Sequence, residues 1–511
     1  MTTPTESAAR GAISTSHHLA TEAGAEVLRA GGNAIDAAIA AAATLCVVYP
    51  NNVALGGDLV ALVRSPSGEV RFLNATGTAP GAQSLDVLRE RYGDLLPLRG
   101  IDTVTVPGGV RGWHALHEYG ATRRWDQHLE AATRHAEDGV PTARSVAAAI
   151  VENREVLELD PGCRGVFFDG GLPLVEGAPL VQPALAESLK RLAAGGAAEF
   201  YEGSLAEQWT AGLQRLGSKI SLSDTAAYTP EWGEPLEGSF GEHRVLTGPP
   251  NTSGFMLLRA LRDIAAGISD PLGAGAGALA QSFRASNAVR AASLADPRFG
   301  GATGAELIAA DAPAHPPVRE AKPSGDTVGL SAVSADGWAI SLINSVYFGF
   351  GSAVLEPETG ILFQNRGTSF SLDPVHPNAF GPGKRPRHTL MPVLVLRGDE
   401  LAWVPATMGG SAQPQIHTQL LLRSLAGASP EAATHAPRWI VDEPGVDGVV
   451  RVTIEEDVPG EVHEAIATAG FPLKVVPPVT EDLGHSNLIR LTADGVDAAS
   501  DPRSDGSAIV V

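Results

Sequence analysis

The chain has 511 residues, of which 44% are hydrophobic and 19% are charged, and its formal net charge is −21. This composition is typical of a folded protein with one large domain or a few smaller ones, and it excludes a disordered chain. The two cysteines allow at most one bridge, which excludes a disulfide scaffold, and the negative charge disfavours a nucleic-acid partner.

The N-terminal sequence MTTPTESAARGAIST is polar and lacks the basic region and apolar core of a secretion signal. The longest apolar stretch, residues 35–49, contains Asp36 and is shorter than the roughly 20 residues that a membrane-spanning helix needs. We therefore expect a cytoplasmic protein with no membrane partner.

Helical patterns dominate the first two hundred or so residues. A helix is expected over residues 20–30, because Gly31-Gly32 is a typical helix end, and a second helix is expected from an Asn33 cap through Val48. Longer helical patterns cover residues 124–156 and 181–216. Between the short and the long helices, residues 58–64 and 69–75 flank the turn sequence SPSG and predict two paired strands.

Residues 311–326 hold four prolines and a glycine, which is typical of an exposed loop. Beyond them, apolar residues alternate on both sides of Asp336-Gly337, a strong hairpin signal. Two registers fit. A two-residue loop places Ser345 opposite Val328, whereas a three-residue loop places it opposite Thr327. In the second register the two hydroxyl side chains share a face, with their Cβ atoms about 5 Å apart.

Residues 326–345, DTVGLSAVSADGWAISLINS, resemble the start of the small subunit of γ-glutamyltransferases, N-terminal-nucleophile hydrolases that cut themselves just before a threonine. Eight further blocks match family signatures in the same order: GGNAIDAAIAAA (31–42), PNNVALGGDLVALV (50–63), FYEGSLAEQW (200–209), GPPNTSGFMLLRAL (248–261), LADPRFG (294–300), KRPRHTLMPVLV (384–395), MGGSAQPQ (408–415) and DPRSDGSA (501–508). The chain is identified as a member of this family.

The resemblance implies an α+β fold, a four-layer αββα sandwich. It also implies cleavage between Asp326 and Thr327 into a large subunit, residues 1–326, and a small subunit, residues 327–511, which form a heterodimer. Further dimerisation stays open, and we expect no cofactor and no metal.

The proposed chemistry of Thr327 rests on its position after the cut. A threonine hydroxyl is a weak nucleophile unless a base takes its proton. The α-amine released at Thr327 has an ordinary pKa of about 7.7–8.0 and can serve as that base near neutral pH. Before cleavage the same nitrogen is an amide, so the uncut chain is expected to be an inactive precursor.

Two further features complete the catalytic residues that the resemblance implies. Ser345 stands in place of the family's second threonine and is expected to position the nucleophile. Gly409-Gly410 follows an apolar strand and is expected to offer backbone N–H groups to the negatively charged oxygen of the tetrahedral intermediate, although glycine pairs usually form turns.

The sequence departs from the family where the substrate is bound. Family members hold the α-carboxylate of glutamate with the arginine of an Arg-Glu-x-Ala-Pro segment, which here begins at Thr76 and has no positive charge. They clamp the α-ammonium with an acid, which Ser369 replaces here, while Arg366 stands where a neutral residue was. Two serines of the family become His388-Thr389.

A family asparagine that follows the second threonine becomes Tyr347. The site has therefore lost a partner for an ammonium and gained a partner for a carboxylate, since an arginine can bind a carboxylate with two hydrogen bonds. We expect Arg366, His388, Thr389, Tyr347, Ser369 and Thr76 to line the substrate site.

These changes predict a small anionic amide whose acyl part carries a carboxylate but no α-amino group, as in oxamate amidohydrolases and dicarboxylic-acyl cephalosporin acylases. Arg366 would supply the local positive charge that an anion needs in an acidic molecule. Three alternatives stay open: a true γ-glutamyltransferase or glutathione hydrolase, an Arg366 that lies on the surface, and an unprocessed relative that binds without catalysis.

Two histidines, His114 and His117, are spaced to share one face of a helix and could bind a metal. No third ligand follows at a recognisable spacing. A packing or surface pair is the simpler interpretation.

Overall fold

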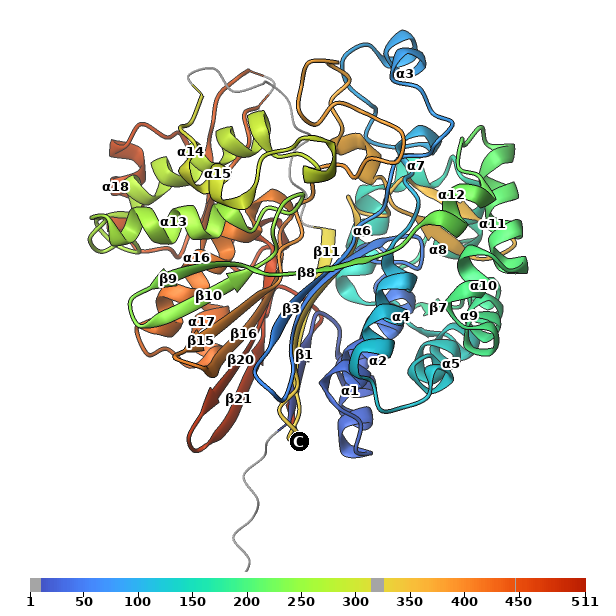
Figure 1. Cartoon of the computed structure of the whole chain (residues 1–511), viewed down its shortest axis with the longest axis horizontal. Helices are drawn as coiled ribbons and strands as arrows, with labels where there is room; N and C mark the ends of the chain where they lie inside the picture. Colours follow the sequence, from blue (N-terminus) through green and yellow to red (C-terminus); the bar gives the residue numbers. More distant parts are fainter. Residues whose placement is uncertain (1–10, 314–325, 446) are drawn as a thin grey trace, which may run out of the picture.

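The computed structural model describes residues 11–313, 326–445 and 447–511. The chain folds into a four-layer αββα sandwich, as the family resemblance implies: two mainly antiparallel sheets face each other, and helices cover both outer faces (Figure 1). The expected exposed loop, residues 311–326, lies largely outside the described residues. Within the described parts of the chain, no helix is long and apolar enough to cross a bilayer, and Cys46 and Cys163 are both buried and unbridged.

One sheet has seven strands, and its centre carries the hairpin that begins at the predicted cut. Its strands, in spatial order, are β22 (Ser507–Val510), β1 (Ala12–Thr15), β11 (Asp326–Val333), β12 (Ala339–Tyr347), β2 (Asp58–Arg64), β3 (Val70–Ala75) and β8 (Glu231–Gly233).

The second sheet has six strands and packs against the first. Its strands, in spatial order, are β21 (Gly495–Ser500), β20 (His485–Thr492), β16 (Glu400–Met408), β15 (Val393–Arg397), β10 (His243–Thr247) and β9 (Leu236–Phe240). Apolar side chains from both sheets, among them Leu62, Ile343 and Val404, form the buried layer between them.

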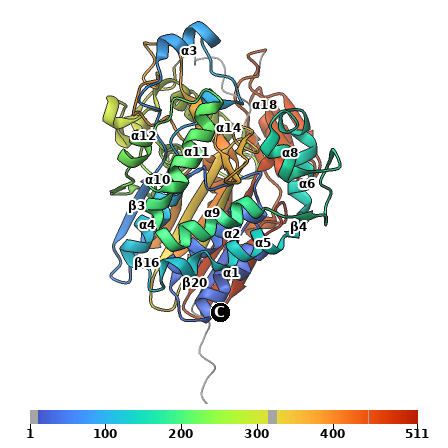
Figure 2. The same cartoon turned by 90° about the vertical axis from the view of Figure 1, so that its right-hand side faces the viewer.

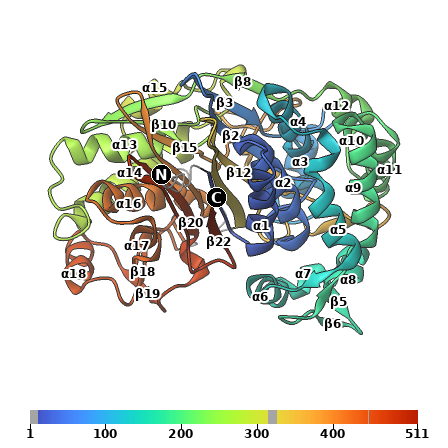
Figure 3. The same ribbon diagram turned by 90° about the horizontal axis from the view of Figure 1, so that it is seen from below.

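Two helical layers enclose the sheets (Figures 2 and 3). The layer on the seven-stranded sheet includes α1 (His18–Arg29), α2 (Ala34–Val48), α4 (Gly109–Gly120), α5 (Glu130–Asp138), α9 (Pro183–Gly195), α10 (Ala197–Tyr201) and α11 (Ser204–Arg215). The layer on the six-stranded sheet includes α13 (Phe255–Ala265), α14 (Ala276–Ser293), α16 (Gln413–Leu425), α17 (Pro430–His435) and α18 (Gly460–Thr468).

Shorter elements connect these layers. They are α3 (Leu85–Tyr92), η1 (Ile101–Thr103), η2 (Trp125–His128), β4 (Val140–Pro141), α6 (Arg144–Glu152), α7 (Arg154–Leu157), α8 (Pro161–Phe167), β5 (Phe168–Asp169), β6 (Leu172–Pro173), β7 (Pro179–Leu180), α12 (Leu222–Ala227), η3 (Pro297–Phe299), α15 (Gly304–Ala309), β13 (Val354–Glu356), β14 (Ile361–Phe363), η4 (Arg366–Ser369), η5 (Gly410–Ala412), β17 (Trp439–Val441), β18 (Val452–Glu455), β19 (Leu473–Val476) and η6 (Glu481–Leu483).

Helix α2 shows why the early predictions hold. Asn33 caps it by accepting from the backbone N–H groups of Ile35 and Asp36, and the Asp36 carboxylate accepts from the N–H of Asn33 in return. Its apolar residues surround the axis, and all of its residues are buried, as suits a helix enclosed by others. The predicted strands at 58–64 and 69–75 are also confirmed, as β2 and β3.

The two long helical patterns are confirmed as helical regions, and each is divided into several helices. The region 124–156 breaks at Gly139, which has a positive φ of 80° and leads into the short strand β4. The region 181–216 breaks at Gly196, with a φ of 72°. Glycine adopts these left-handed conformations without strain, so the chain turns there despite apolar spacing that would suit a longer helix.

The register of the central hairpin is the one with a three-residue loop. Val328 faces Asn344 and Val333 faces Ala339, so that paired residue numbers sum to 672. The ladder then shifts by one residue between Asp326 and Val328, which places Thr327 at a bulge where the strand leaves regular pairing. Bulges re-aim a side chain and are common beside active sites.

Candidate active site

The two hydroxyl groups predicted to meet at the end of the hairpin do so. Thr327 Oγ1 lies 3.0 Å from Ser345 Oγ, within hydrogen-bond distance, and both residues are buried. Ser345 Oγ also accepts the backbone N–H of Tyr347 at 2.8 Å, so its position is fixed by the strand that carries it. The contact supports Ser345 as the residue that positions Thr327, and both catalytic roles stay predictions.

The loop after α2 contacts the backbone of Thr327. Asn51 donates from its side-chain amide to Asn52 Oδ1 at 3.1 Å, and Asn52 donates from its own amide to the Thr327 carbonyl at 3.4 Å. Both asparagines are buried. These side chains were not singled out from the sequence, because only the fold brings residue 52 against residue 327.

Gly409 and Gly410 follow β16 directly and have positive φ angles of 153° and 53°. Contacts between the two sheets indicate which residues of β16 lie opposite β11. Ser341, the partner of Ser331 in the hairpin, donates to the Pro405 carbonyl, and a Cβ added at Gly329 would lie 2.8 Å from the Thr407 nitrogen.

A step of two residues back along β11, from Ser331 to Gly329, therefore corresponds to a step of two residues forward along β16, from Pro405 to Thr407. The next such step points toward Thr327, at the bulge of β11, and toward Gly409, just after β16. This placement supports the predicted pair of N–H donors, and their role in catalysis stays a prediction.

Arg366 is fully buried in η4 and lies close to the hairpin end. Its guanidinium carbon is 3.5 Å from the centre of the Tyr347 ring, Nη1 donates to Ser369 Oγ at 3.3 Å, and Nη2 donates to Thr389 Oγ1 at 3.2 Å. Four of the predicted substrate residues therefore meet, and the alternative of a surface arginine is wrong, since Arg366 is 0% exposed. Tyr347 has a φ of 85°, a strained value for a residue with a side chain.

His388 lies beside Thr389 but faces a different partner. Its Nε2 is 3.1 Å from Asp58 Oδ2, and its Nδ1 accepts the backbone N–H of Leu390 at 3.3 Å. Burial, together with the nearby charges of Arg366 and Arg290, lowers the pKa of His388 well below its usual value. The ring is therefore neutral with its proton on Nε2, and the contact with Asp58 is a hydrogen bond to a carboxylate.

Asp58, the first residue of β2, is a buried residue of this site that the sequence predictions missed. Oδ1 accepts from Gln364 Nε2 at 2.8 Å, from the Gly77 N–H at 2.8 Å and from the Gly108 N–H at 3.3 Å. Burial raises the pKa of Asp58 to about 6, against the opposing effect of the Gln364 hydrogen bond and the Arg366 charge. A charged residue directly before the apolar run of residues 59–63 is the signal that could have found it.

Thr76 lies next to this carboxylate site through Gly77, with its hydroxyl held by the protein. It donates to Asn74 Oδ1 at 2.7 Å and accepts from Asn251 Nδ2 at 3.3 Å. Like the two nitrogens of His388, it would have to give up a protein contact to bind a substrate. Direct substrate contacts of Thr76 and His388 stay predictions.

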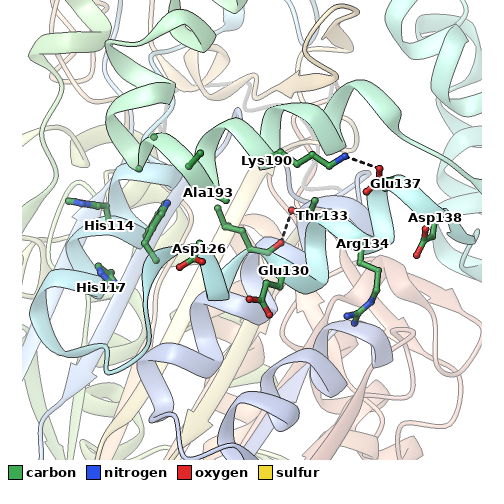
Figure 4. A pocket seen from close by; sticks show the side chains of 15 residues that line it. His114, His117, Asp126, Glu130, Thr133, Arg134, Glu137, Asp138, Lys190 and Ala193 are labelled. Carbon is green, nitrogen blue, oxygen red and sulfur yellow. Dashed lines mark hydrogen bonds and ion pairs between the residues drawn. The ribbon is translucent and has the colours of Figure 1, made fainter.

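A large groove on the surface lies elsewhere. It has a volume of about 920 Å³ and runs between α9 and the segment η2–α5, with His114, His117 and an ion pair between Lys190 and Glu137 along it (Figure 4). None of the candidate active-site residues lines it. Over the described residues, no group of three or more side chains could hold a metal ion, so the two histidines have no third ligand there.

Comparison with known proteins gives consistent matches over the whole chain. A family model described as gamma-glutamyltranspeptidase matches residues 20–511. The glutathione hydrolase-like YwrD proenzyme of Bacillus subtilis (strain 168) is 34% identical over 516 residues, covering 96% of this chain and 97% of that protein. The oxamate amidohydrolase proenzyme of Klebsiella pneumoniae subsp. pneumoniae is 33% identical, covering 96% of this chain and 97% of that protein.

A solved structure also matches this chain over its full length. The crystal structure of a cephalosporin acylase from Bacillus halodurans has a TM-score of 0.88 at 30% identity, covering 100% of this chain and 98% of that one. The sequence and structure matches both extend across the residues on either side of Thr327.

Proposed function

Because this chain belongs to the γ-glutamyltranspeptidase family of N-terminal-nucleophile hydrolases, we propose that it cuts itself before Thr327 and then hydrolyses an amide whose acyl part carries a carboxylate but no α-amino group. The cut divides the chain into residues 1–326 and 327–511. Two of the relatives are named as proenzymes, which supports a precursor that is processed.

The reaction follows from the groups at the hairpin end. Thr327 Oγ1 attacks the carbonyl carbon of the amide, while the released α-amine of Thr327 takes the hydroxyl proton directly or through one water. Ser345 Oγ, 3.0 Å away, holds the attacking oxygen in place. The backbone N–H groups of Gly409 and Gly410 stabilise the negative oxygen of the tetrahedral intermediate.

Collapse of that intermediate breaks the C–N bond. The proton held by the α-amine passes to the leaving nitrogen, and the acyl group stays on Thr327 as an ester. Water then attacks the ester carbonyl, giving its proton to the same amine, and the carboxylic acid leaves as Thr327 recovers its hydroxyl.

One observation carries the choice of acyl group: Arg366 is buried beside Tyr347, two residues beyond Ser345 on β12. A buried guanidinium binds a carboxylate strongly, because low local polarity strengthens the attraction between their charges. Ser369, at the position expected to hold an acid for an ammonium, instead accepts a hydrogen bond from Arg366. The relatives named oxamate amidohydrolase and cephalosporin acylase support the same choice.

The test compares two anilides that differ in one group. Glutaryl p-nitroanilide has the skeleton of γ-glutamyl p-nitroanilide without the α-amino group, and oxamate is measured alongside. We expect kcat/KM for the glutaryl compound to exceed that for the γ-glutamyl compound by about tenfold or more, as loss of one charged partner predicts.

Preference for the γ-glutamyl anilide, with oxamate ignored, would overturn the proposed specificity in favour of a glutathione hydrolase, the activity suggested by the name of the Bacillus subtilis relative. A protein that stays a single 52.7-kDa band on a denaturing gel would favour an unprocessed binding protein instead.

A further inference from the structure

Asp58 connects the segments that carry the candidate substrate residues. Its side chain accepts hydrogen bonds from Gly77, which follows Thr76, from Gln364, which precedes Arg366 by two residues, and from His388, which precedes Thr389. All of these groups are buried in one place, although they come from distant parts of the sequence.

The backbone of Asp58 is tied to the catalytic hairpin as well. In the seven-stranded sheet Asp58 is the partner of Ser345, and Asn344 donates from its side chain to the Asp58 carbonyl at 2.7 Å. The same residue therefore touches the strand that holds the nucleophile's partner and the loops that hold Arg366 and Thr389.

Gly77 is suited to this arrangement because it has no side chain. A Cβ added there would lie 1.9 Å from the Val106 carbonyl oxygen and 3.0 Å from Asp58 Oδ1. Only glycine lets the backbone N–H of residue 77 approach the carboxylate at 2.8 Å, because any side chain there would collide with the Val106 carbonyl.

We propose that Asp58 is a specificity-determining positioning residue: through Gln364 and His388 it holds Arg366 and Thr389 where they bind the carboxylate of the acyl group. The inference rests on the proposed function in taking Arg366 as the ligand of that carboxylate. Asp58 itself touches no substrate, because its oxygens face the protein donors.

The direction of the hydrogen bonds makes the proposal specific. Leu390 N–H occupies His388 Nδ1, so the ring proton is on Nε2 and points at Asp58. Asparagine at position 58 could keep an oxygen toward Gln364 and Gly77 but would turn an NH₂ group toward the Nε2–H of His388. Two donors would then face each other, and a buried unsatisfied donor is costly.

A second substitution can remove that conflict. Glutamine at position 388 places an amide close to where Nε2 lies, and it can present its oxygen to an asparagine at position 58. The variant Asp58→Asn should therefore be more damaging than Asp58→Asn combined with His388→Gln, which a simple loss of charge at residue 58 does not predict.

The experiment uses the full self-processed protein and two anilides, glutaryl p-nitroanilide and pentanoyl p-nitroanilide, in which a methyl group replaces the carboxylate. For Asp58→Asn we expect kcat/KM for the glutaryl compound to fall about thirtyfold, mainly through KM, and that for the pentanoyl compound to fall less than about threefold. In the double variant the glutaryl value should return to within about fivefold of the unmodified enzyme.

The matched control is Asp36→Asn, which changes another buried Asp–His pair away from these segments. It should leave the ratio between the two anilides unchanged. Equal losses on both anilides in Asp58→Asn, or a double variant no better than Asp58→Asn alone, would overturn the proposal.

Calorimetric binding of glutarate gives a readout that needs no turnover. We expect its Kd to rise about tenfold or more in Asp58→Asn and to stay unchanged in Asp36→Asn. An unchanged Kd in Asp58→Asn, or no glutarate binding by the unmodified protein, would count against the inference.

The proposed function is judged separately, on the unmodified enzyme, by the ratio of glutaryl to γ-glutamyl turnover. Both of those anilides carry a carboxylate. The comparison of Asp58 variants can therefore be made with whichever is turned over, even if the preference for the glutaryl compound is wrong.

Discussion

Among the residues that the structure describes, two buried Asp–His pairs have nearly the same geometry and behave in opposite ways. Asp36 Oδ1 is 2.9 Å from His128 Nε2, and Asp58 Oδ2 is 3.1 Å from His388 Nε2, with all four side chains fully buried. Burial raises the pKa of Asp36, but hydrogen bonds from His128, Thr122 and backbone groups outweigh it and lower the pKa overall. At Asp58 burial prevails, and the pKa rises to about 6.

The difference lies in what surrounds each carboxylate. Asp36 sits in the first turn of α2, where backbone N–H groups and the helix dipole favour a negative charge. Asp58 begins a strand and is buried so deeply that desolvation outweighs the hydrogen bonds from Gln364, Gly77 and Gly108, the last at the start of α4, and the charge of Arg366. A buried carboxyl group with a raised pKa is common at functional sites. A carboxylate that stabilises the fold, by contrast, is typical of a helix cap.

The largest expected effect comes from removing Thr327, the nucleophile of the reaction that the Asp58 pair is proposed to serve. Thr327→Ala should abolish both self-cleavage and hydrolysis, because no other group at the hairpin end replaces the nucleophile and its amine. A denaturing gel would show one 52.7-kDa band. The control, Asp36→Asn, should still give two fragments. A fragment that begins at residue 327 in the Thr327→Ala protein would contradict the mechanism.

The second prediction concerns the structural pair. Asp36→Asn, made in the uncut Thr327→Ala chain so that one polypeptide unfolds, should lower the free energy of unfolding by about 3–5 kcal/mol, since it breaks a buried pair and a helix cap. Urea unfolding followed by circular dichroism measures it. In the processed enzyme KM should not change. A variant as stable as the parent would show that Asp36 contributes no more to the free energy of unfolding than a surface residue does.

The third prediction separates the pairs by pH. Asp58 has a folded-state pKa of about 6, above its unfolded value of 3.8, so its contribution to stability is present below pH 4 and is lost as the pH rises through 6. The shift of about two units corresponds to at most ~3 kcal/mol. The contribution of Asp36, whose pKa is lowered, is present above its unfolded value of 3.8 and is lost on acidification below it.

The pH dependence of the Asp58 contribution is measured by urea unfolding of the uncut chain with and without Asp58→Asn between pH 4 and 7. The same series for Asp36→Asn, extended to lower pH, measures the pH dependence of the Asp36 contribution. The stability difference between parent and Asp58→Asn should shift in favour of Asp58→Asn as the pH rises. A flat difference across this range would contradict the raised pKa.

The smallest expected effect concerns Arg366, the side chain that the Asp58 pair is proposed to hold in place. Arg366→Gln should lower kcat/KM for glutaryl p-nitroanilide about fiftyfold, close to 2.3 kcal/mol, through loss of a charged partner for the carboxylate. Pentanoyl p-nitroanilide should be affected much less. Arg298→Gln, which changes a half-exposed arginine on η3, is the control and should leave both values unchanged.

Local signals in the sequence predict a large part of this architecture. The Asn33 cap, the two strands that follow and the hairpin around Asp336-Gly337 depend on neighbouring residues, and all are confirmed. The choice between the two hairpin registers was open from the sequence, because both loop lengths are allowed; the structure has the register that brings Ser345 toward Thr327.

What the sequence could not predict depends on contacts between distant segments. Asp58 reads as the start of an ordinary strand until residues 77, 364 and 388 are brought against it. The breaks at Gly139 and Gly196 were missed because apolar spacing continues through them. The burial of Arg366 in η4 likewise depends on Tyr347, which stacks on it from the end of β12.

The order of strands in the seven-stranded sheet bears on what the proposed cut can do. The proposed small subunit supplies strands β22, β11 and β12 to this sheet, and the large subunit supplies β1, β2, β3 and β8. The two sets interleave in the order β22-β1-β11-β12-β2. Three backbone ladders of this sheet, and the β10–β15 ladder of the other sheet, would therefore join the two fragments. Cleavage at Thr327 would create a new chain end without separating the pieces, and the processed enzyme should travel as a single particle until it is denatured.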